Sequence, residues 1–404
     1  MHPLIYDWNT VDAPPDPPRP VMLDDETLRD GLQSPSVRTP TIDQKLRILH
    51  MMEALDIDSV DIGLPGAGPH VVRDVERLAK EIVAAKLRIR PNCAARTTLG
   101  DITPVVEISQ RAGIAIECCT FIGSSPIRQF TEDWTLDHLQ RLTEEAVGAA
   151  VKEGLPVMYV TEDTTRADPE SLRRLYTAAI RAGAKRLCIA DTVGHATPAG
   201  ARAVVRFVQS IVDAAGGHIG VDWHGHRDRD LAVENSLAAM EAGATRLHGA
   251  ALGIGERVGN TPIDALLTNL VLMGYRQTDL TRLGEYCALV SEACGVPIPA
   301  NYPVVGRDAF RTATGVHAAA VIKAIKKRDV SLVDAVYSGV PASLVGRAQA
   351  IEIGPLSGRS NVVFWLESRG MEATDELVDR IFTKAKSSSS VLTEAEVRAA
   401  AKDE

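Results

Sequence analysis

The stretch Ile219-Gly220-Val221-Asp222-Trp223-His224-Gly225-His226 joins a short apolar run to a pair of histidines. The run predicts a buried β-strand, and two imidazoles at positions i and i+2 of its end would point to the same side. Imidazoles placed in this way can bind one metal ion. A single His-x-His pair in a strand is more often structural, but carboxylate, amide and arginine clusters recur at similar places along this chain. The stretch therefore predicts a strand that ends in a catalytic metal site.

The same kind of apolar run occurs eight times. The runs are Val21–Leu23, Val60–Ile62, Leu87–Ile89, Ile114–Cys118, Pro156–Val160, Leu187–Ala190, Ile219–Trp223 and Leu247–Ala250. Between them lie segments with helical periodicity, namely Thr41–Leu55, Val71–Ala85, Asp137–Lys152, Pro169–Ala182, Pro198–Ala214, Asp230–Ala242 and Pro262–Met273. Eight strands that alternate with helices over roughly 270 residues predict a (β/α)8 TIM barrel, whose active site lies where the strands end.

Polar residues follow the runs, as a barrel requires. Glu26, Arg29 and Asp30 come after the first run, Glu162 after the fifth, Asp191 and Thr192 after the sixth, and Glu256 and Asn260 after the eighth. A doubly wound sheet has the same alternation of strands and helices, but it would not bring the first and eighth loops together, whereas barrel closure does. The barrel is therefore the favoured fold.

Composition narrows the class of protein. The formal net charge of -9 over 404 residues disfavours nucleic acid or an anionic membrane as the main partner. No apolar run is long enough to span a bilayer, and residues 1–20 lack the basic start and apolar centre of a signal peptide. The six cysteines show no C-x-x-C spacing, which favours buried, reduced thiols in a cytoplasmic protein.

The alternation of strands and helices stops after Gly274. Helices are expected over Leu283–Ala293, Asp308–Lys326 and Glu394–Lys402. We therefore divide the chain into an N-terminal extension (1–19), a catalytic TIM barrel (20–294) and a mostly helical C-terminal appendage (295–404).

Three motifs in this order resemble those of the DRE-TIM metallolyases. They are Glu26-Thr27-Leu28-Arg29-Asp30-Gly31, His224-Gly225-His226, and the loop Gly253-Ile254-Gly255-Glu256-Arg257-Val258-Gly259-Asn260. The resemblance covers roughly Val21 to Trp365 and favours the Claisen-condensing branch, which contains the 2-isopropylmalate, homocitrate and citramalate synthases. The lyase branch of the family shares the first two motifs but usually lacks the glycine-rich loop and the appendage, and both are present here.

The resemblance implies a role for each matching residue. Asp30, His224 and His226 would ligate a divalent metal ion (Mg, Mn or Zn), and Asn260 would ligate it or hold a water. Arg29 would stabilise the alkoxide that forms on the 2-oxo acid; the alternative is a salt bridge with Glu26 or Glu162. Glu162 would join the proton-transfer network, Thr192 would hold the substrate carboxylate, and Gln33 is a further candidate substrate contact. His317 and Tyr337 of the appendage would activate acetyl-CoA.

Two departures from the family pattern bear on the substrate. Leu32 stands where many of the synthases have a glutamate, and Leu64 replaces the more usual aromatic residue. A less charged pocket favours 2-oxoisovalerate, and hence 2-isopropylmalate synthase. Arg96, after the third strand, could instead bind the second carboxylate that homocitrate synthase requires. A retro-aldol acyl-CoA lyase and a catalytically inactive binding barrel are the alternatives from other classes.

The family also implies an assembly. We expect a homodimer in which the appendage of one subunit covers the barrel of the other. The long 2-isopropylmalate synthases carry an extra regulatory domain, and nothing after Arg380 has the strand content to form one. Feedback inhibition through such a domain is therefore not expected.

Overall fold

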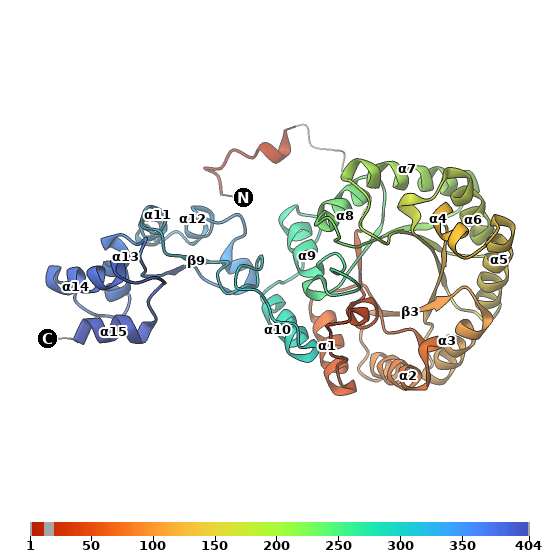
Figure 1. Ribbon diagram of the computed structural model, residues 1–404, viewed down its shortest axis with the longest axis horizontal. Helices are drawn as coiled ribbons and strands as arrows, with labels where there is room; N and C mark the ends of the chain where they lie inside the picture. The colour runs from red at the N-terminus through yellow and green to blue at the C-terminus, as the bar shows by residue number, and fades with distance from the viewer. Residues whose placement is uncertain (1, 12–19, 403–404) are drawn as a thin grey trace. The chain divides into compact units, whose positions relative to one another are not determined.

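The computed structural model describes residues 2–11 and 20–402. Eight parallel strands form a closed barrel in sequence order, with helices around it (Figure 1). The strands are β1 (Met22–Asp25), β2 (Ser59–Asp61), β3 (Arg90–Arg96), β4 (Glu117–Gly123), β5 (Val157–Glu162), β6 (Arg186–Asp191), β7 (Gly220–Gly225) and β8 (Arg246–Gly249). The predicted (β/α)8 TIM barrel is confirmed.

Two strands lie later in the chain than their apolar runs suggested. The prediction of a strand at Leu87–Ile89 was wrong, because β3 begins at Arg90, and β4 overlaps its predicted run by only two residues. Strand β3 consists of small and polar residues, and Asn92 on it donates a hydrogen bond of 2.6 Å to Asp24 on β1. Hydrophobicity alone therefore did not reveal a strand that contributes polar groups to the barrel core.

Nine described helices surround the barrel strands, and seven of them follow their predicted positions closely. The nine are α1 (Ile42–Ala54), α2 (Pro69–Ala84), α3 (Leu99–Ala112), α4 (Pro126–Thr131), α5 (Leu136–Lys152), α6 (Pro169–Ala182), α7 (Pro198–Ala215), α8 (Ala232–Glu241) and α9 (Ile263–Leu272). Side chains of Thr41, Thr135, Asp168 and Thr197 cap four of them by accepting a backbone N–H. Helices α3 and α4 were not predicted: α3 contains Pro104 in its second turn, and α4 is only six residues long.

Barrel closure joins the first and eighth strands. The backbone N–H of Glu26 donates to the carbonyl of Gly249 (2.7 Å), and that of Ala251 donates to the hydroxyl of Thr27 (2.8 Å). Helix α10 (Leu283–Cys294) packs on this seam, where the buried Tyr286 hydroxyl donates to Asp25 (2.5 Å). Closure brings the loop after β1 next to the loop after β8, as the order of the motifs required.

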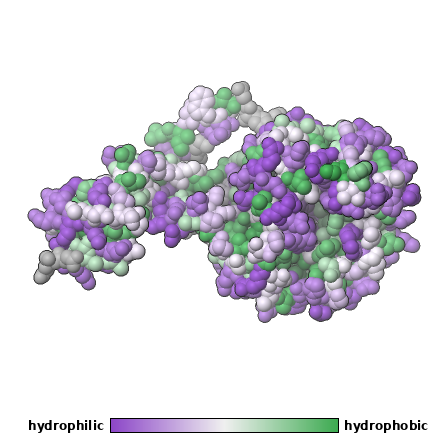
Figure 2. All heavy atoms as spheres, viewed as in Figure 1, coloured by the Kyte–Doolittle hydropathy of each residue, from purple (hydrophilic) through white to green (hydrophobic). Residues whose placement is uncertain are grey.

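The described chain forms two compact units. The barrel unit contains residues 20–278 and Glu285–Pro297, and the second unit contains residues 2–11, Asp279–Gly284 and 298–402. The first unit is the one seen down the barrel axis in Figure 1, and its visible face carries mostly hydrophilic residues with scattered hydrophobic ones (Figure 2). Met1 and residues 12–19 of the predicted N-terminal extension lie outside the described residues.

The second unit is mostly helical. It contains α11 (Gly315–Lys326), α12 (Val330–Ala335), α13 (Arg359–Glu367), α14 (Asp375–Lys386) and α15 (Glu394–Lys402). Helix α11 begins later than predicted, because Arg311–Thr312 (β9) pairs in parallel with Ala350–Ile351 (β10). All six cysteines of the chain are buried and free. No helix in the described ranges is long and apolar enough to cross a membrane.

Candidate active site

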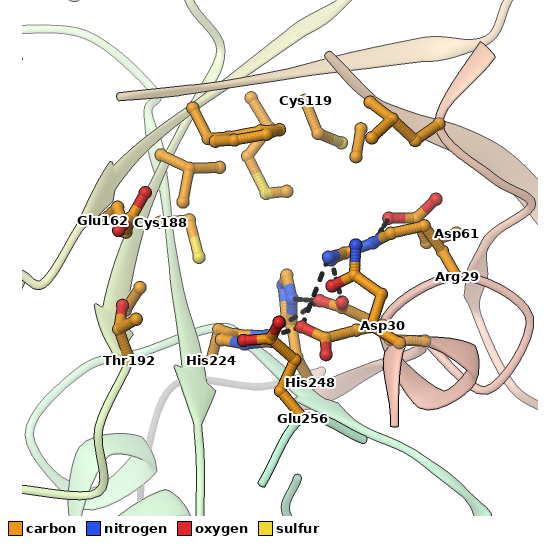
Figure 3. A pocket seen from close by; sticks show the side chains of 18 of the residues that line it. Arg29, Asp30, Asp61, Cys119, Glu162, Cys188, Thr192, His224, His248 and Glu256 are labelled. Carbon is orange, nitrogen blue, oxygen red and sulfur yellow. Dashed lines mark hydrogen bonds and ion pairs between the residues drawn. The ribbon is translucent and has the colours of Figure 1, made fainter. Parts of the chain in front are cut away.

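A cavity opens at the carboxyl ends of the barrel strands (Figure 3). Of the predicted site residues, the following line it: Arg29, Asp30, Gln33, Glu162, Thr192, His224 and His226. The remaining lining residues are Glu26, Asp61, Leu64, Ala94, Cys119, Phe121, Met158, Val160, Cys188, Ala190, His248 and Glu256. Residues from the first, fifth, sixth and seventh strand ends thus meet in one place, because parallel strands in a barrel present their carboxyl ends at the same face.

The predicted metal ligands lie together. The Nε2 atoms of His224 and His226 are 3.2 Å apart, and they lie 3.4 and 3.8 Å from Oδ2 of Asp30. Three donor atoms this close to one another can bind a single ion. Burial, together with the neighbouring His224, lowers the pKa of His226 to about 4, so its imidazole is neutral at pH 7. Burial opposes ionisation of Asp30, but Arg29 and His224 outweigh it and lower the pKa of this carboxyl. Both residues are therefore in the protonation states that metal binding requires.

Three buried polar atoms beside this group have no hydrogen-bond partner. They are Oδ1 of Asp30, Nδ1 of His226 and Oδ1 of Asn260. Asn260 does not line the cavity, but its backbone pairs with that of His226, and its amide nitrogen donates to the carbonyl of Ile254 (3.0 Å). The free amide oxygen is a hard donor that a divalent ion accepts. The donor set therefore fits the metal that the motifs implied.

Arg29 joins three carboxylates. Its guanidinium donates to Asp61 (2.7 Å) and Asp30 (3.2 Å), and it forms an ion pair with Glu26. The predicted partner Glu26 is thus present, whereas Glu162 pairs with Arg128 at 3.4 Å. Since the side chain of Arg29 is 18% exposed and lines the cavity, it can also face a bound substrate.

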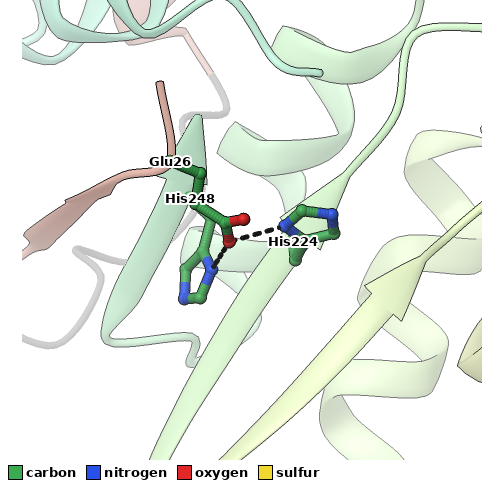
Figure 4. A group of neighbouring side chains, drawn as sticks. All are labelled: Glu26, His224 and His248. Atoms are coloured by element: carbon green, nitrogen blue, oxygen red, sulfur yellow. Dashed lines mark hydrogen bonds and ion pairs between the residues drawn. The ribbon is translucent and has the colours of Figure 1, made fainter. Parts of the chain in front are cut away.

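Two residues of this site were not predicted as functional. They are Glu26 and His248, and Oε1 of Glu26 lies within hydrogen-bond distance of both His248 and His224 (Figure 4). Burial opposes protonation of His248, but Asp24, Asp222 and Glu26 outweigh it and raise the pKa to about 10. Glu26 stands inside the first motif, and His248 stands in the eighth apolar run, where a lone histidine gives no recognisable signal.

Glu162 and Thr192 lie on the opposite side of the cavity from the metal group (Figure 3). Burial raises the pKa of Glu162, although Arg128 opposes the shift. A carboxyl with a raised pKa can exchange protons nearer to neutral pH. The Thr192 hydroxyl oxygen accepts the backbone N–H of Asp163 (2.8 Å), so its own hydrogen is available to a ligand.

The glycine-rich loop Gly253–Asn260 is held in a conformation that requires glycine. Gly259 has φ +108°, and a Cβ there would overlap the carbonyl oxygen of Gly253. Arg257 of the loop pairs with Asp228 at 2.8 Å and donates to the carbonyl of Thr192 at 2.6 Å. The loop therefore connects Asn260 to the carboxyl ends of β6 and β7.

Besides Asn260, three predicted residues do not line the cavity. Arg96 is the last residue of β3, and its guanidinium binds Asp101 through two hydrogen bonds of 2.8 Å. His317 and Tyr337 belong to the second unit, where the Tyr337 hydroxyl lies 2.7 Å from Nδ1 of His317 and the two rings stack. The structure thus pairs these two residues with each other.

Comparison with known proteins assigns the family. The model of the HMGL-like family matches residues 21–290. A homocitrate synthase of Methanopyrus kandleri is 34% identical over 381 residues, which cover 92% of this chain and 88% of that protein. A probable 2-isopropylmalate synthase of the same organism is 32% identical over 374 residues, which cover 91% of this chain and 70% of that protein. Among solved structures, the HMG-CoA lyase of Bacillus subtilis matches with a TM-score of 0.59 at 20% identity, covering 71% of this chain and 97% of that chain, which shows a common fold.

The chain therefore belongs to the HMGL-like, or DRE-TIM metallolyase, family. Within it, the Claisen-condensing branch that contains the homocitrate, 2-isopropylmalate and citramalate synthases includes this protein, as its motifs suggested. It is an enzyme of the class that condenses acetyl-CoA with a 2-oxo acid, and this family is metal-dependent.

Proposed function

We propose that this enzyme is a 2-isopropylmalate synthase, which joins the methyl carbon of acetyl-CoA to the keto carbon of 2-oxoisovalerate and releases CoA after thioester hydrolysis. The observation that carries the proposal is the apolar part of the cavity lining, of which Cys119 and Cys188 are labelled in Figure 3. It consists of Ala94, Cys119, Phe121, Met158, Val160, Cys188 and Ala190. An apolar wall favours a branched hydrocarbon side chain, because a charged one would lose its hydration without compensation.

The charges around the cavity support the same substrate. Arg29 is the single lysine or arginine among the described lining residues, and three carboxylates already bind it. A homocitrate synthase needs a cation for the distal carboxylate of its substrate. Arg96, the candidate for that cation from the sequence, pairs with Asp101 and does not line the cavity. Homocitrate or another malate homologue is therefore the alternative product.

Asp30, His224 and His226 would hold the divalent ion, with Asn260 as a further oxygen donor. When bound, the ion would act as a Lewis acid on the keto group of the 2-oxo acid. One carboxylate, two imidazoles and an amide oxygen suit Mg, Mn or Zn.

Other residues of the cavity would position the 2-oxo acid and move protons. Arg29 would donate to the keto oxygen as negative charge develops on it. The free hydroxyl hydrogen of Thr192 would bind the substrate carboxylate, and Gln33 would contact the same molecule. Glu162, with its raised pKa, would take part in proton transfer.

Acetyl-CoA would be activated by the appendage. His317 and Tyr337 form a hydrogen-bonded pair that offers a base and a hydroxyl donor, which enolisation of the acetyl methyl group requires. We propose a cytoplasmic homodimer in which these residues act at the barrel of the other subunit.

A panel of 2-oxo acids tests the substrate. Free CoA thiol would be followed with acetyl-CoA and pyruvate, 2-oxobutyrate, 2-oxoisovalerate or 2-oxoglutarate. We expect the highest kcat/KM with 2-oxoisovalerate and a value about 100-fold lower with 2-oxoglutarate, since burying an unpaired carboxylate costs several kcal/mol. Preference for 2-oxoglutarate that is lost in Arg96→Ala would show the homocitrate alternative to be right.

The same assay tests the metal and the reaction class. Chelation should abolish CoA release, and added Mn²⁺, Mg²⁺ or Zn²⁺ should restore it. Full activity after exhaustive metal removal would contradict the proposed site. Cleavage of a 3-hydroxyacyl-CoA without any condensation would indicate the lyase reaction instead.

A further inference from the structure

Glu26 lies at the junction of the metal group and Arg29. Its Oε1 is 2.9 Å from Nδ1 of His224 and 2.7 Å from Nδ1 of His248, and its Oε2 pairs with Arg29. The residue is 2% exposed. One buried carboxylate therefore contacts a candidate metal ligand, a catalytic arginine and a third buried side chain that the proposed function leaves without a role.

The contacts determine where the protons of the two imidazoles lie. A carboxylate that is paired with Arg29 can only accept hydrogen bonds, so both nitrogens that face Oε1 must carry hydrogen. For His224 this selects the tautomer with Nδ1–H. Its Nε2 then keeps a lone pair, and this atom is the one that faces His226 and Asp30.

His248 is itself held in place on the side away from Glu26. Its Nε2 lies 3.0 Å from Oδ2 of Asp222, and Arg186 and Arg246 in turn fix that aspartate at 2.6 and 2.5 Å. Both ring nitrogens of His248 thus face carboxylates, and neither has a lone pair to offer. Although Glu26, His224 and His248 are spaced closely enough for a second ion, they form a chain of hydrogen bonds.

We propose that Glu26 and His248 are positioning residues that keep His224 in its Nδ1–H tautomer and thereby direct its Nε2 toward the metal. Glu26 touches His224 directly, and His248 acts through Glu26 by fixing the carboxylate from its other side. The inference rests on the proposed metal site. It requires the tautomer to be set before an ion binds.

Two measurements on the full-length protein test the inference. Two-bond ¹H–¹⁵N spectra of metal-free enzyme with ¹⁵N-labelled histidine show which ring nitrogen of His224 is protonated. Titration with Mn²⁺, followed through the EPR signal of the free ion, gives the metal affinity. We expect Nδ1–H in the wild type, and 10- to 100-fold weaker Mn²⁺ binding in Glu26→Gln and His248→Asn, about the effect known for lost partners of metal-ligating histidines.

Tyr286→Phe is the matched control. It removes buried hydrogen bonds to Asp25 and Thr27, the two neighbours of Glu26, and leaves the contacts of Glu26 with His248 and His224 in place, so it should bind Mn²⁺ as the wild type does. A proton on Nε2 of His224 in the wild type would overturn the inference, as would control-like Mn²⁺ affinity in both chain variants. If Glu26→Gln does not fold, the tautomer of His224 in the wild-type spectrum and the Mn²⁺ affinity of His248→Asn test the inference without it. A wild type that binds no Mn²⁺ would overturn the proposed metal site and this inference with it.

Discussion

Arg29 shows how one residue serves both structure and chemistry. The guanidinium pairs with Glu26, Asp30 and Asp61 and reduces the repulsion among these buried carboxyl groups. Its surroundings raise its pKa well above the ordinary range, because these carboxylates outweigh the effect of burial. The two interpretations drawn from the sequence, a salt bridge and an oxyanion partner, are therefore compatible.

Replacing Arg29 should separate catalysis from metal binding. We expect Arg29→Ala to lower turnover by about 100-fold or more, the scale for loss of one oxyanion partner. Mn²⁺ affinity should change much less, since Asp30, His224 and His226 remain. Steady-state CoA release and Mn²⁺ titration measure the two effects, with the exposed Arg88→Ala as control. Loss of metal together with activity would mean that Arg29 is mainly structural.

The raised pKa of Asp25 predicts that the stability of the protein depends on pH. Burial raises its pKa to about 7, although Thr27 and Tyr286 donate hydrogen bonds to it. Between pH 4 and 7 the folded state thus binds a proton that the unfolded state has lost. Unfolding free energy should therefore fall as pH rises through this window, by up to roughly 4 kcal/mol from this residue.

Denaturant unfolding of wild type and Asp25→Asn at pH 5 and pH 8 measures this effect. The wild type should lose more stability between the two values than the variant, because asparagine stays neutral at both. Equal losses would show that Asp25 does not titrate in this range.

At the scale of elements, the loop Gly253–Asn260 depends on its backbone. Gly259 combines φ +108° with a close approach to Gly253, whereas Gly274 has φ +77° with no atom near the position of a Cβ. Both positions disfavour other residues, but only the first would force the loop to move.

Gly259→Ala and Gly274→Ala form a matched pair. The first should displace Asn260 and lower CoA release by roughly 100-fold, as small misplacements in active sites do. The second should cost about 1–2 kcal/mol of stability and leave turnover unchanged, because it acts only through the left-handed backbone. Normal turnover in Gly259→Ala would contradict the role assigned to the loop.

At the scale of the whole molecule, the proposed catalytic groups are divided between two units. The metal group belongs to the barrel unit, and His317 and Tyr337 belong to the unit that contains residues 298–402. If one unit activates acetyl-CoA and the other binds the 2-oxo acid, the two units must meet at one active site. An isologous dimer would supply this twice, once at each barrel.

Mixed dimers test the arrangement. Asp30→Ala and His317→Ala should each be nearly inactive alone, but a mixed dimer would have one site with an intact barrel and an intact appendage. Co-refolding equal amounts should recover about a quarter of wild-type activity, because half of random dimers are mixed and each has one good site of two. Mass spectrometry would confirm mixing. Mixed dimers without activity would mean that each appendage serves its own barrel.

The barrel and most of its site could be predicted from local patterns. Apolar runs and helical periodicity revealed six of the eight strands, since most strands of a buried parallel sheet are nearly continuous apolar segments. The residues Asp30, His224 and His226 were recognisable because strand ends of a barrel converge. Strand β3 was not predicted, because its side chains are small or polar and contribute to a buried polar network.

The sequence by itself determined the fold, the family and the candidate metal ligands, because each depends on short-range spacing that a folded barrel must respect. Only the tertiary structure revealed that Glu26, from the first loop, meets both His248 on the eighth strand and His224 on the seventh. It also showed that Arg96 is bound to Asp101 away from the cavity. Contacts between residues 222 positions apart in the chain depend on barrel closure and on side-chain direction, and neither leaves a local pattern in the sequence.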